Sequence, residues 1–168
     1  MILDRRWKND LKVIKIKLEI ISKLKIKSSL IEHLVKKYYL YSAAIIRKTY
    51  EYQKENEPTK KIDNFLYLID YKVKVLSYDY IGDGDYVCYN LDKSDYDFSN
   101  SISCDIAVNC VCNQIIHSVV FSVIYDFDKN TICGISVSSS NFKYKKMYLI
   151  KIEEYINLID HAIENLPK

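Results

Sequence analysis

Apolar residues recur at helical spacing in four stretches of the chain, separated by stretches that alternate with a period of two. Between residues 4 and 26 the apolar positions fall three or four apart, which predicts an amphipathic helix with a core-facing stripe: Leu11, Ile14, Leu18 and Ile21. A second set of apolar residues widens this stripe: Val13, Ile16, Ile20 and Leu24. The run KVIKIKL also alternates with period two, so a strand is the alternative there. We favour the helix because the segment is long and its lysines are unbranched.

A second and longer helix is predicted over residues 29–55. Ser28 or Ser29 can cap its first turn, and Glu32 lies three residues after Ser29, as in a capping box. The polar run at 53–61, QKENEPTKK, predicts a linker, because its proline cannot continue the helix and its other side chains have nothing to bury.

Two further helices and several short strands are predicted after this linker. The helices are expected at Ser103–His117 and Ile152–Leu166, where apolar residues again follow helical spacing. Period-two alternation and β-branched residues predict strands over residues 71–75, 119–125, 131–138 and 147–150.

The run Gly82-Asp83-Gly84-Asp85 is the strongest turn signal in the chain, and it predicts a β-hairpin completed by residues 86–89. The expected fold class is therefore α+β. We expect a single domain over residues 1–168, with four helices and with antiparallel β-hairpins inserted or appended.

The composition excludes several classes of function. With only three glycines and two prolines, the chain has no glycine-rich phosphate loop and no dinucleotide-binding fingerprint. Asp79, Asp83 and Asp85 lack the ligand spacing of an EF-hand. The five cysteines form no zinc or redox motif, so we expect reduced thiols, with Cys110 and Cys112 free of metal. No metal site and no cofactor are expected.

Charge is distributed unevenly along the chain although the net charge is only +3. Residues 1–27 hold nine Lys or Arg, whereas residues 63–105 hold nine Asp. This contrast is typical of internal complementarity, self-association or a site for a polyanion. No stretch approaches the ~20 apolar residues of a membrane span, and the charged N-terminal segment does not resemble a secretory signal. We therefore expect a cytoplasmic protein without a membrane partner.

Candidate chemistry is concentrated in the third predicted helix. Asn113 and His117 are four residues apart and share a helix face with Ile106 and Cys110, which predicts an amide and an imidazole on a buried stripe. Arg47, in the second predicted helix, can pair with Glu51 four residues later.

Two long helices, a linker, a His-bearing third helix and a closing helix resemble the HEPN superfamily of small helical nucleases and toxin-related proteins. The signature of that family is an arginine separated from a histidine by four to six residues. His117 matches the histidine, whereas Cys110-Val111-Cys112 stands where the arginine belongs. The resemblance covers the helices and not the strands. It implies phosphodiester cleavage, for which His117, Arg47 and Asn113 are the candidate catalytic residues.

Three hypotheses follow. The first is a small interaction or regulatory domain that binds a macromolecular partner, in keeping with a loose resemblance to small proteins of bacterial mobile elements and phage-conflict systems. The second is a HEPN-like ribonuclease that uses His117 and Arg47. The third is a structural role, in which Asn113 and His117 satisfy buried backbone carbonyls or Arg47 and hold the helices in register. The partners considered are a protein, an RNA or a second copy of the chain. The candidate nucleic-acid-binding residues are Lys12, Lys15, Lys143 and Lys145.

Overall fold

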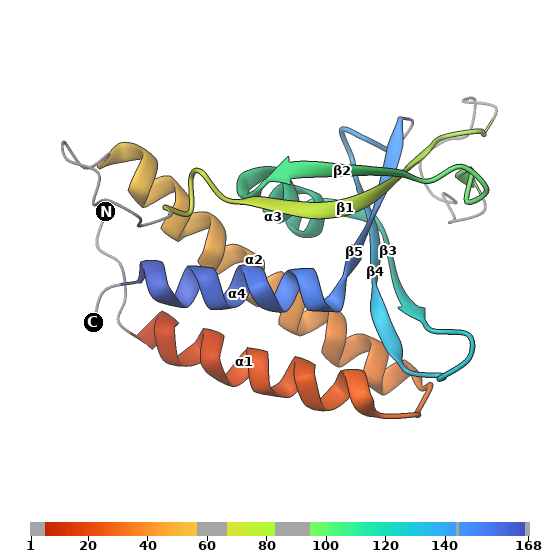
Figure 1. Cartoon of the computed structure of the whole chain (residues 1–168), viewed down its shortest axis with the longest axis horizontal. Helices are drawn as coiled ribbons and strands as arrows, with labels where there is room; N and C mark the ends of the chain where they lie inside the picture. The colour runs from red at the N-terminus through yellow and green to blue at the C-terminus, as the bar shows by residue number, and fades with distance from the viewer. Residues whose placement is uncertain (1–5, 57–66, 83–94, 144, 167–168) are drawn as a thin grey trace.

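A computed structural model describes residues 6–56, 67–82, 95–143 and 145–166. These residues form four helices and five strands that agree with the expected α+β class (Figure 1). In chain order the elements are α1 (Arg6–Lys23), α2 (Ser29–Glu55), β1 (Lys72–Asp79), β2 (Ile102–Ala107), α3 (Val108–Ile116), β3 (Ser118–Tyr125), β4 (Ile132–Ser139), β5 (Lys146–Lys151) and α4 (Ile152–Asn165).

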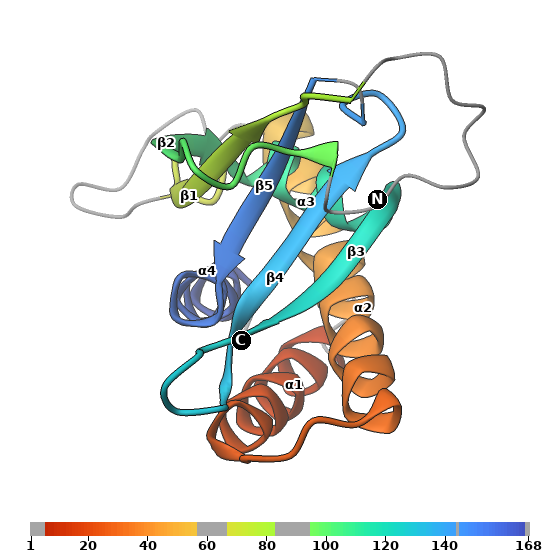
Figure 2. The same cartoon turned by 90° about the vertical axis from the view of Figure 1, so that its right-hand side faces the viewer.

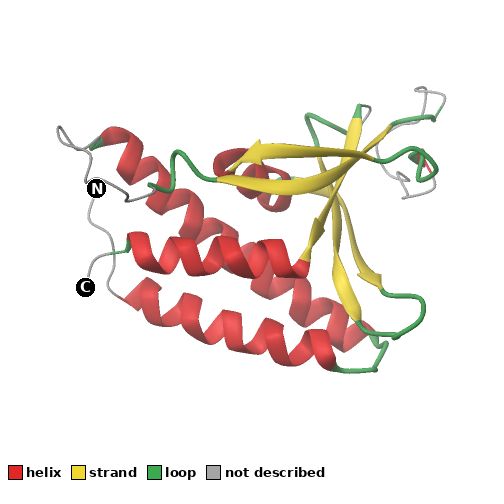
Figure 3. Cartoon of the chain, viewed as in Figure 1, coloured by secondary structure: helices red, strands yellow, loops and turns green. Residues whose placement is uncertain are grey.

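The three longest helices, α1, α2 and α4, pack on one another to one side of the sheet (Figure 3). Helix α1 forms as predicted and buries its main apolar stripe: Leu11, Ile14, Leu18 and Ile21. Helix α2 begins after Ser28, whose hydroxyl accepts a hydrogen bond from the Ile31 amide. Helix α3 is short and packs against α2, in which Ala43 is buried and Ala44 is exposed. No helix in the described ranges is both long enough and apolar enough to cross a membrane.

All strand pairs in the sheet are antiparallel, and the strand order is β2-β1-β5-β4-β3 (Figure 2). Strand β5 therefore lies in the centre of the sheet, although it is the last of the five strands in chain order. At Gly134 in β4 the neighbouring strand approaches closely: a Cβ there would collide with the Ile150 carbonyl oxygen and crowd the Lys151 Cα. Glycine is required at this position because any side chain would separate β4 from β5.

Between the helices and the sheet lies one large apolar core that draws residues from every helix. At its centre the rings of Tyr39 and Tyr155 stack with a centroid distance of 4.2 Å. The Tyr155 hydroxyl shares a hydrogen bond with the Ser42 hydroxyl at 2.8 Å and donates to the Tyr39 carbonyl at 3.1 Å. The Tyr39 hydroxyl, in contrast, is buried and has no hydrogen-bond partner among the described residues.

Several local predictions are wrong. The segment at 102–107 is strand β2 and not the first half of a helix, because it pairs with β1 over six residues. Three residues expected to widen the core stripe of α1 are about half exposed, since they lie on the opposite face: Val13, Ile16 and Ile20. Glu32 does not form the predicted capping box with Ser29, because the cap is Ser28 and the residue three positions after it is Ile31. The Glu32 carboxylate instead accepts a hydrogen bond from the Tyr125 hydroxyl. Residues 86–89, expected in a hairpin, lie outside the described residues.

Candidate functional site

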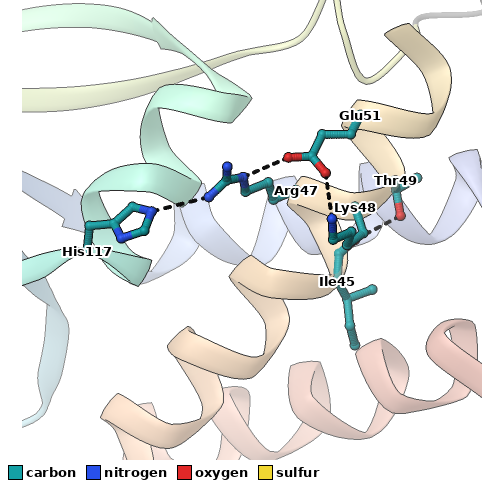
Figure 4. A network of polar contacts seen from close by, with 6 residues as sticks. All are labelled: Ile45, Arg47, Lys48, Thr49, Glu51 and His117. Atoms are coloured by element: carbon teal, nitrogen blue, oxygen red, sulfur yellow. Dashed lines mark hydrogen bonds and ion pairs between the residues drawn. The ribbon is translucent and has the colours of Figure 1, made fainter. Parts of the chain in front are cut away.

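Arg47 and His117 meet although seventy positions separate them in the chain. Arg47 lies in the C-terminal half of α2, and His117 is the single residue between α3 and β3. Arg47 Nη1 lies 3.3 Å from His117 Nε2 (Figure 4). The packing of α3 against α2 brings the two side chains together.

The chemistry of this contact depends on the tautomer of the imidazole. A guanidinium only donates hydrogen bonds, so the pair is hydrogen-bonded in the tautomer in which His117 Nε2 accepts and Nδ1 carries the ring proton. A neutral imidazole with an unprotonated Nε2 can take up a proton from a substrate, and a neighbouring guanidinium can bind an anion.

Glu51 determines the direction in which Arg47 points. The Arg47 Nε donates to Glu51 Oε1 at 2.9 Å, and Lys48 Nζ donates to Glu51 Oε2 at 2.9 Å (Figure 4). The hydrogen bond from Lys48, followed by that from Arg47, lowers the pKa of the Glu51 carboxyl below its ordinary value. The predicted pairing of Arg47 with Glu51 is thus confirmed, and it leaves the Nη groups free to reach across to α3.

A cleft of about 380 Å³ surrounds the Arg47–His117 pair. Its lining includes four amide side chains and a hydroxyl: Asn109, Asn113, Gln114, Asn141 and Ser139. His117 is exposed, and the Arg47 side chain is 34% exposed, so both side chains are accessible from solvent. The expectation that His117 lies on a buried stripe is wrong, because Ile106 belongs to β2 and His117 follows the last turn of α3.

The buried polar residue of α3 is Gln114, which the sequence analysis did not single out. Gln114 is 1% exposed, and its Oε1 accepts a hydrogen bond from the Ser139 amide at 2.9 Å. The Ser140 amide also donates to the His117 carbonyl at 3.2 Å. These two bonds attach the end of β4 to α3 and hold both sides of the cleft together. The available signal in the sequence was the amide of Gln114 directly before the apolar pair Ile115 and Ile116.

Asn113 lines the cleft and is half-buried. Its Oδ1 has no hydrogen-bond partner among the described residues, although the atom is buried.

The four candidate nucleic-acid-binding lysines do not form one surface. Lys12 and Lys15 lie on α1, and this helix is far from α3 in both views (Figures 1 and 2). Lys15 also forms an ion pair, with its Nζ 2.6 Å from Asp160 Oδ2. Lys143 and Lys145 lie in the connection between β4 and β5, next to Phe142, which lines the cleft.

Cysteines border the site but supply no metal set. Cys104, Cys110, Cys112 and Cys133 are free thiols, and Cys88 lies outside the described residues. Cys110 lines the cleft, and burial raises the pKa of its thiol. Burial also raises the pKa of Cys112, which is fully buried. Within the described ranges no group of three His, Cys, Asp or Glu side chains could hold a metal ion.

Comparison with protein-family models, with curated proteins and with solved structures finds no match to this chain.

Proposed function

We propose that the Arg47–His117 cleft binds an RNA phosphodiester and cleaves it. The observation that carries the proposal is the 3.3 Å contact between Arg47 Nη1 and His117 Nε2 inside a solvent-accessible cleft. A cationic donor and a neutral imidazole at this separation are the two groups that cleavage by an internal nucleophile requires.

The reaction uses the ribose 2′-hydroxyl as the nucleophile. His117 Nε2 takes the proton of that hydroxyl while the 2′-oxygen forms a bond to the adjacent phosphorus. The bond from phosphorus to the 5′-oxygen breaks, and this oxygen leaves with a proton from water. The products are a 2′,3′-cyclic phosphate and a 5′-hydroxyl, and the imidazolium returns its proton to solvent.

Arg47 stabilises the additional negative charge on phosphorus-bound oxygen in the transition state. To do so, its Nη1 turns from His117 to the phosphate, which also frees Nε2 to accept the proton. Glu51 holds Nε throughout, so the guanidinium pivots about a fixed point. Asn113 lines the same cleft, and its side-chain amide nitrogen is the group that can donate a hydrogen bond to a phosphate oxygen.

The resemblance to HEPN proteins enters this proposal only through the pairing of arginine with histidine. In this chain the arginine comes from α2 and the histidine from the end of α3. The cleft volume falls at the lower end of the ~300–1,000 Å³ typical of small-molecule sites, which suits one nucleotide and its phosphate.

The test compares wild type with His117→Ala, Arg47→Lys and Arg47→Ala on a fluorescent single-stranded RNA. We expect the histidine and arginine variants to lose about 100-fold or more of the cleavage rate. Melting temperatures should change little for His117→Ala, because the side chain is exposed. His33→Ala is the matched control, since His33 is an exposed histidine on α2 away from the cleft.

A substrate with a single 2′-deoxyribose at the scissile position should resist cleavage, and mass spectrometry should find a cyclic phosphate in the products. Equal cleavage by wild type and His117→Ala contradicts the proposal. Binding of RNA that needs Arg47 but leads to no cleavage contradicts the nuclease activity and supports the alternative of an interaction domain.

A further inference from the structure

Strand β3 is an edge of the sheet. Among the described residues it pairs with β4 alone, and Val120 is its only buried residue. The backbone groups on the outer side of an edge strand can accept another strand from a separate chain. An extended peptide bound there gains main-chain hydrogen bonds without any change in the fold.

A groove of about 700 Å³ runs beside this edge. One wall is strand β3 itself, and the other is the start of α2 with the residues just before it (Figure 2). A channel between an edge strand and a helix is the geometry in which an added strand is held from both sides.

Two lysines give the groove its charge. Lys27 Nζ lies 5.3 Å from the ring centroid of Tyr125, and Lys36 Nζ lies 5.4 Å from that of Phe121. Neither lysine has an ion-pair partner in the described part of the chain. The two rings are four strand residues apart, so the two lysine–ring contacts lie about 13 Å apart along the edge.

The acidic residues of the groove are already engaged. Glu32 accepts the hydroxyl of Tyr125 at 3.3 Å, and Asp126 accepts the amides of Asp128 and Lys129 in the turn after β3. Both carboxylates keep their negative charge but are held by these hydrogen bonds, whereas the ammonium groups of Lys27 and Lys36 have no ion-pair partner in the described part of the chain and are the charged groups left to bind a ligand. Phe127 completes the groove at the turn and is fully exposed.

We infer that this groove is a docking site for an extended acidic peptide that adds a strand to β3. The peptide carries two carboxylates about four residues apart, one for Lys27 and one for Lys36, and an apolar side chain that covers Phe127. A second copy of this chain is the wrong occupant. Antiparallel pairing of β3 with itself places Lys27 of each copy near Lys36 of the other, and these like charges repel.

The probe is a fluorescein-labelled peptide of about ten residues, long enough to span the groove when extended, with alternating valine and threonine and two glutamates four positions apart. Fluorescence anisotropy should show binding that weakens as salt increases. Lys27→Glu/Lys36→Glu should weaken it about tenfold or more. Lys23→Glu/Lys54→Glu makes the same change of charge at exposed helix positions outside the groove and should leave binding unchanged.

Two peptides N-methylated at alternate residues, one for each set of amides, separate the two edges of the added strand. The peptide whose methyl groups face β3 should lose binding, because it cannot donate the strand hydrogen bonds, and the other should keep it. The inference fails if the acidic peptide does not bind at about 1 mM, if the Lys27/Lys36 variant or both methylated peptides bind as well as the parent, or if the apo protein dimerises through this edge. Displacement of the peptide by single-stranded RNA, dependent on Lys27 and Lys36, assigns the groove to nucleic acid and overturns the inference. The Lys27/Lys36 variant should cleave RNA at the wild-type rate if the Arg47–His117 cleft is the nuclease site, so this measurement tests the proposed function independently of the peptide groove.

Discussion

Glu51 is the residue on which the geometry of the candidate site depends most directly. Its two carboxylate oxygens hold the Arg47 Nε and the Lys48 Nζ separately, so the guanidinium can move only at its Nη end. Without this carboxylate, His117 is the hydrogen-bond partner that remains for the Arg47 guanidinium among the described residues.

The lowered pKa of Glu51 predicts a pH dependence of stability. Because the folded-state pKa lies below the ordinary value of 4.5, the ionised carboxylate stabilises the fold above pH 4.5, and this contribution is lost as the pH falls through the lowered pKa. Glu51→Gln should therefore cost up to about 1 kcal/mol at neutral pH and nothing in strong acid. Melting temperatures of both proteins across the pH range check this. A difference that grows on acidification contradicts it.

The stacked tyrosines predict opposite effects of two identical substitutions. Tyr155→Phe removes a hydroxyl with two partners and should cost about 1–2 kcal/mol, because Ser42 and the Tyr39 carbonyl lose a bond. Tyr39→Phe removes a buried hydroxyl without a partner and should be neutral or stabilising. Urea denaturation measures both. An equal loss in the two variants shows that the Tyr39 hydroxyl is satisfied in solution.

At the residue scale, only local contacts were predictable. The Arg47–Glu51 pair follows from a spacing of four on a helix. The Arg47–His117 contact needs the packing of α3 on α2, so the sequence could nominate both residues as candidates without giving their distance. The exposure of His117 could not be derived, because it depends on where α3 begins and ends.

Among the elements, Gly134 allows a specific prediction. Gly134→Ala should lower the free energy of unfolding by about 1–3 kcal/mol, since its Cβ meets the backbone of β5 at Ile150 and Lys151, which cannot move aside locally. Gly82→Ala is the matched control, because its Cβ meets only the end of the Tyr80 side chain, which can rotate. Equal stability of the two variants, measured by chemical denaturation, contradicts this account of the β4–β5 contact.

Element type was predictable where one periodicity dominated. Strands β3, β4 and β5 and helix α4 lie within one or two residues of their predicted bounds. The error at 102–107 arose because Ile102, Cys104 and Ile106 alternate with polar residues, while the following residues continue at helical spacing. The segment becomes a strand because it pairs with β1, whose residues lie 25 to 35 positions earlier in the chain. A pattern read over neighbouring residues does not reveal such a distant partner.

For the whole molecule, the strand order predicts a gradient of local stability. Amides of β5, which pairs on both sides, should exchange with solvent more slowly than those of the edge strands β2 and β3. Hydrogen exchange followed by mass spectrometry or nuclear magnetic resonance resolves the segments. Faster exchange in β5 than in β3 contradicts the order. The strand order was not predictable from the sequence. Alternation of apolar and polar residues indicates where a strand lies in the chain but not which strands pair with it.

The central place of β5 has a consequence during synthesis. Until residues 146–151 leave the ribosome, β1 and β2 form one pair and β3 and β4 another, with no strand between them. The nascent chain then exposes the edges of β1 and β4 that β5 covers in the finished fold. It also exposes the apolar faces of α1 and α2 against which α4 later packs. Such surfaces are the ones that chaperones bind and that promote aggregation. Folding of this chain is therefore expected to be completed after translation of its last strand and helix and not stepwise as each segment emerges.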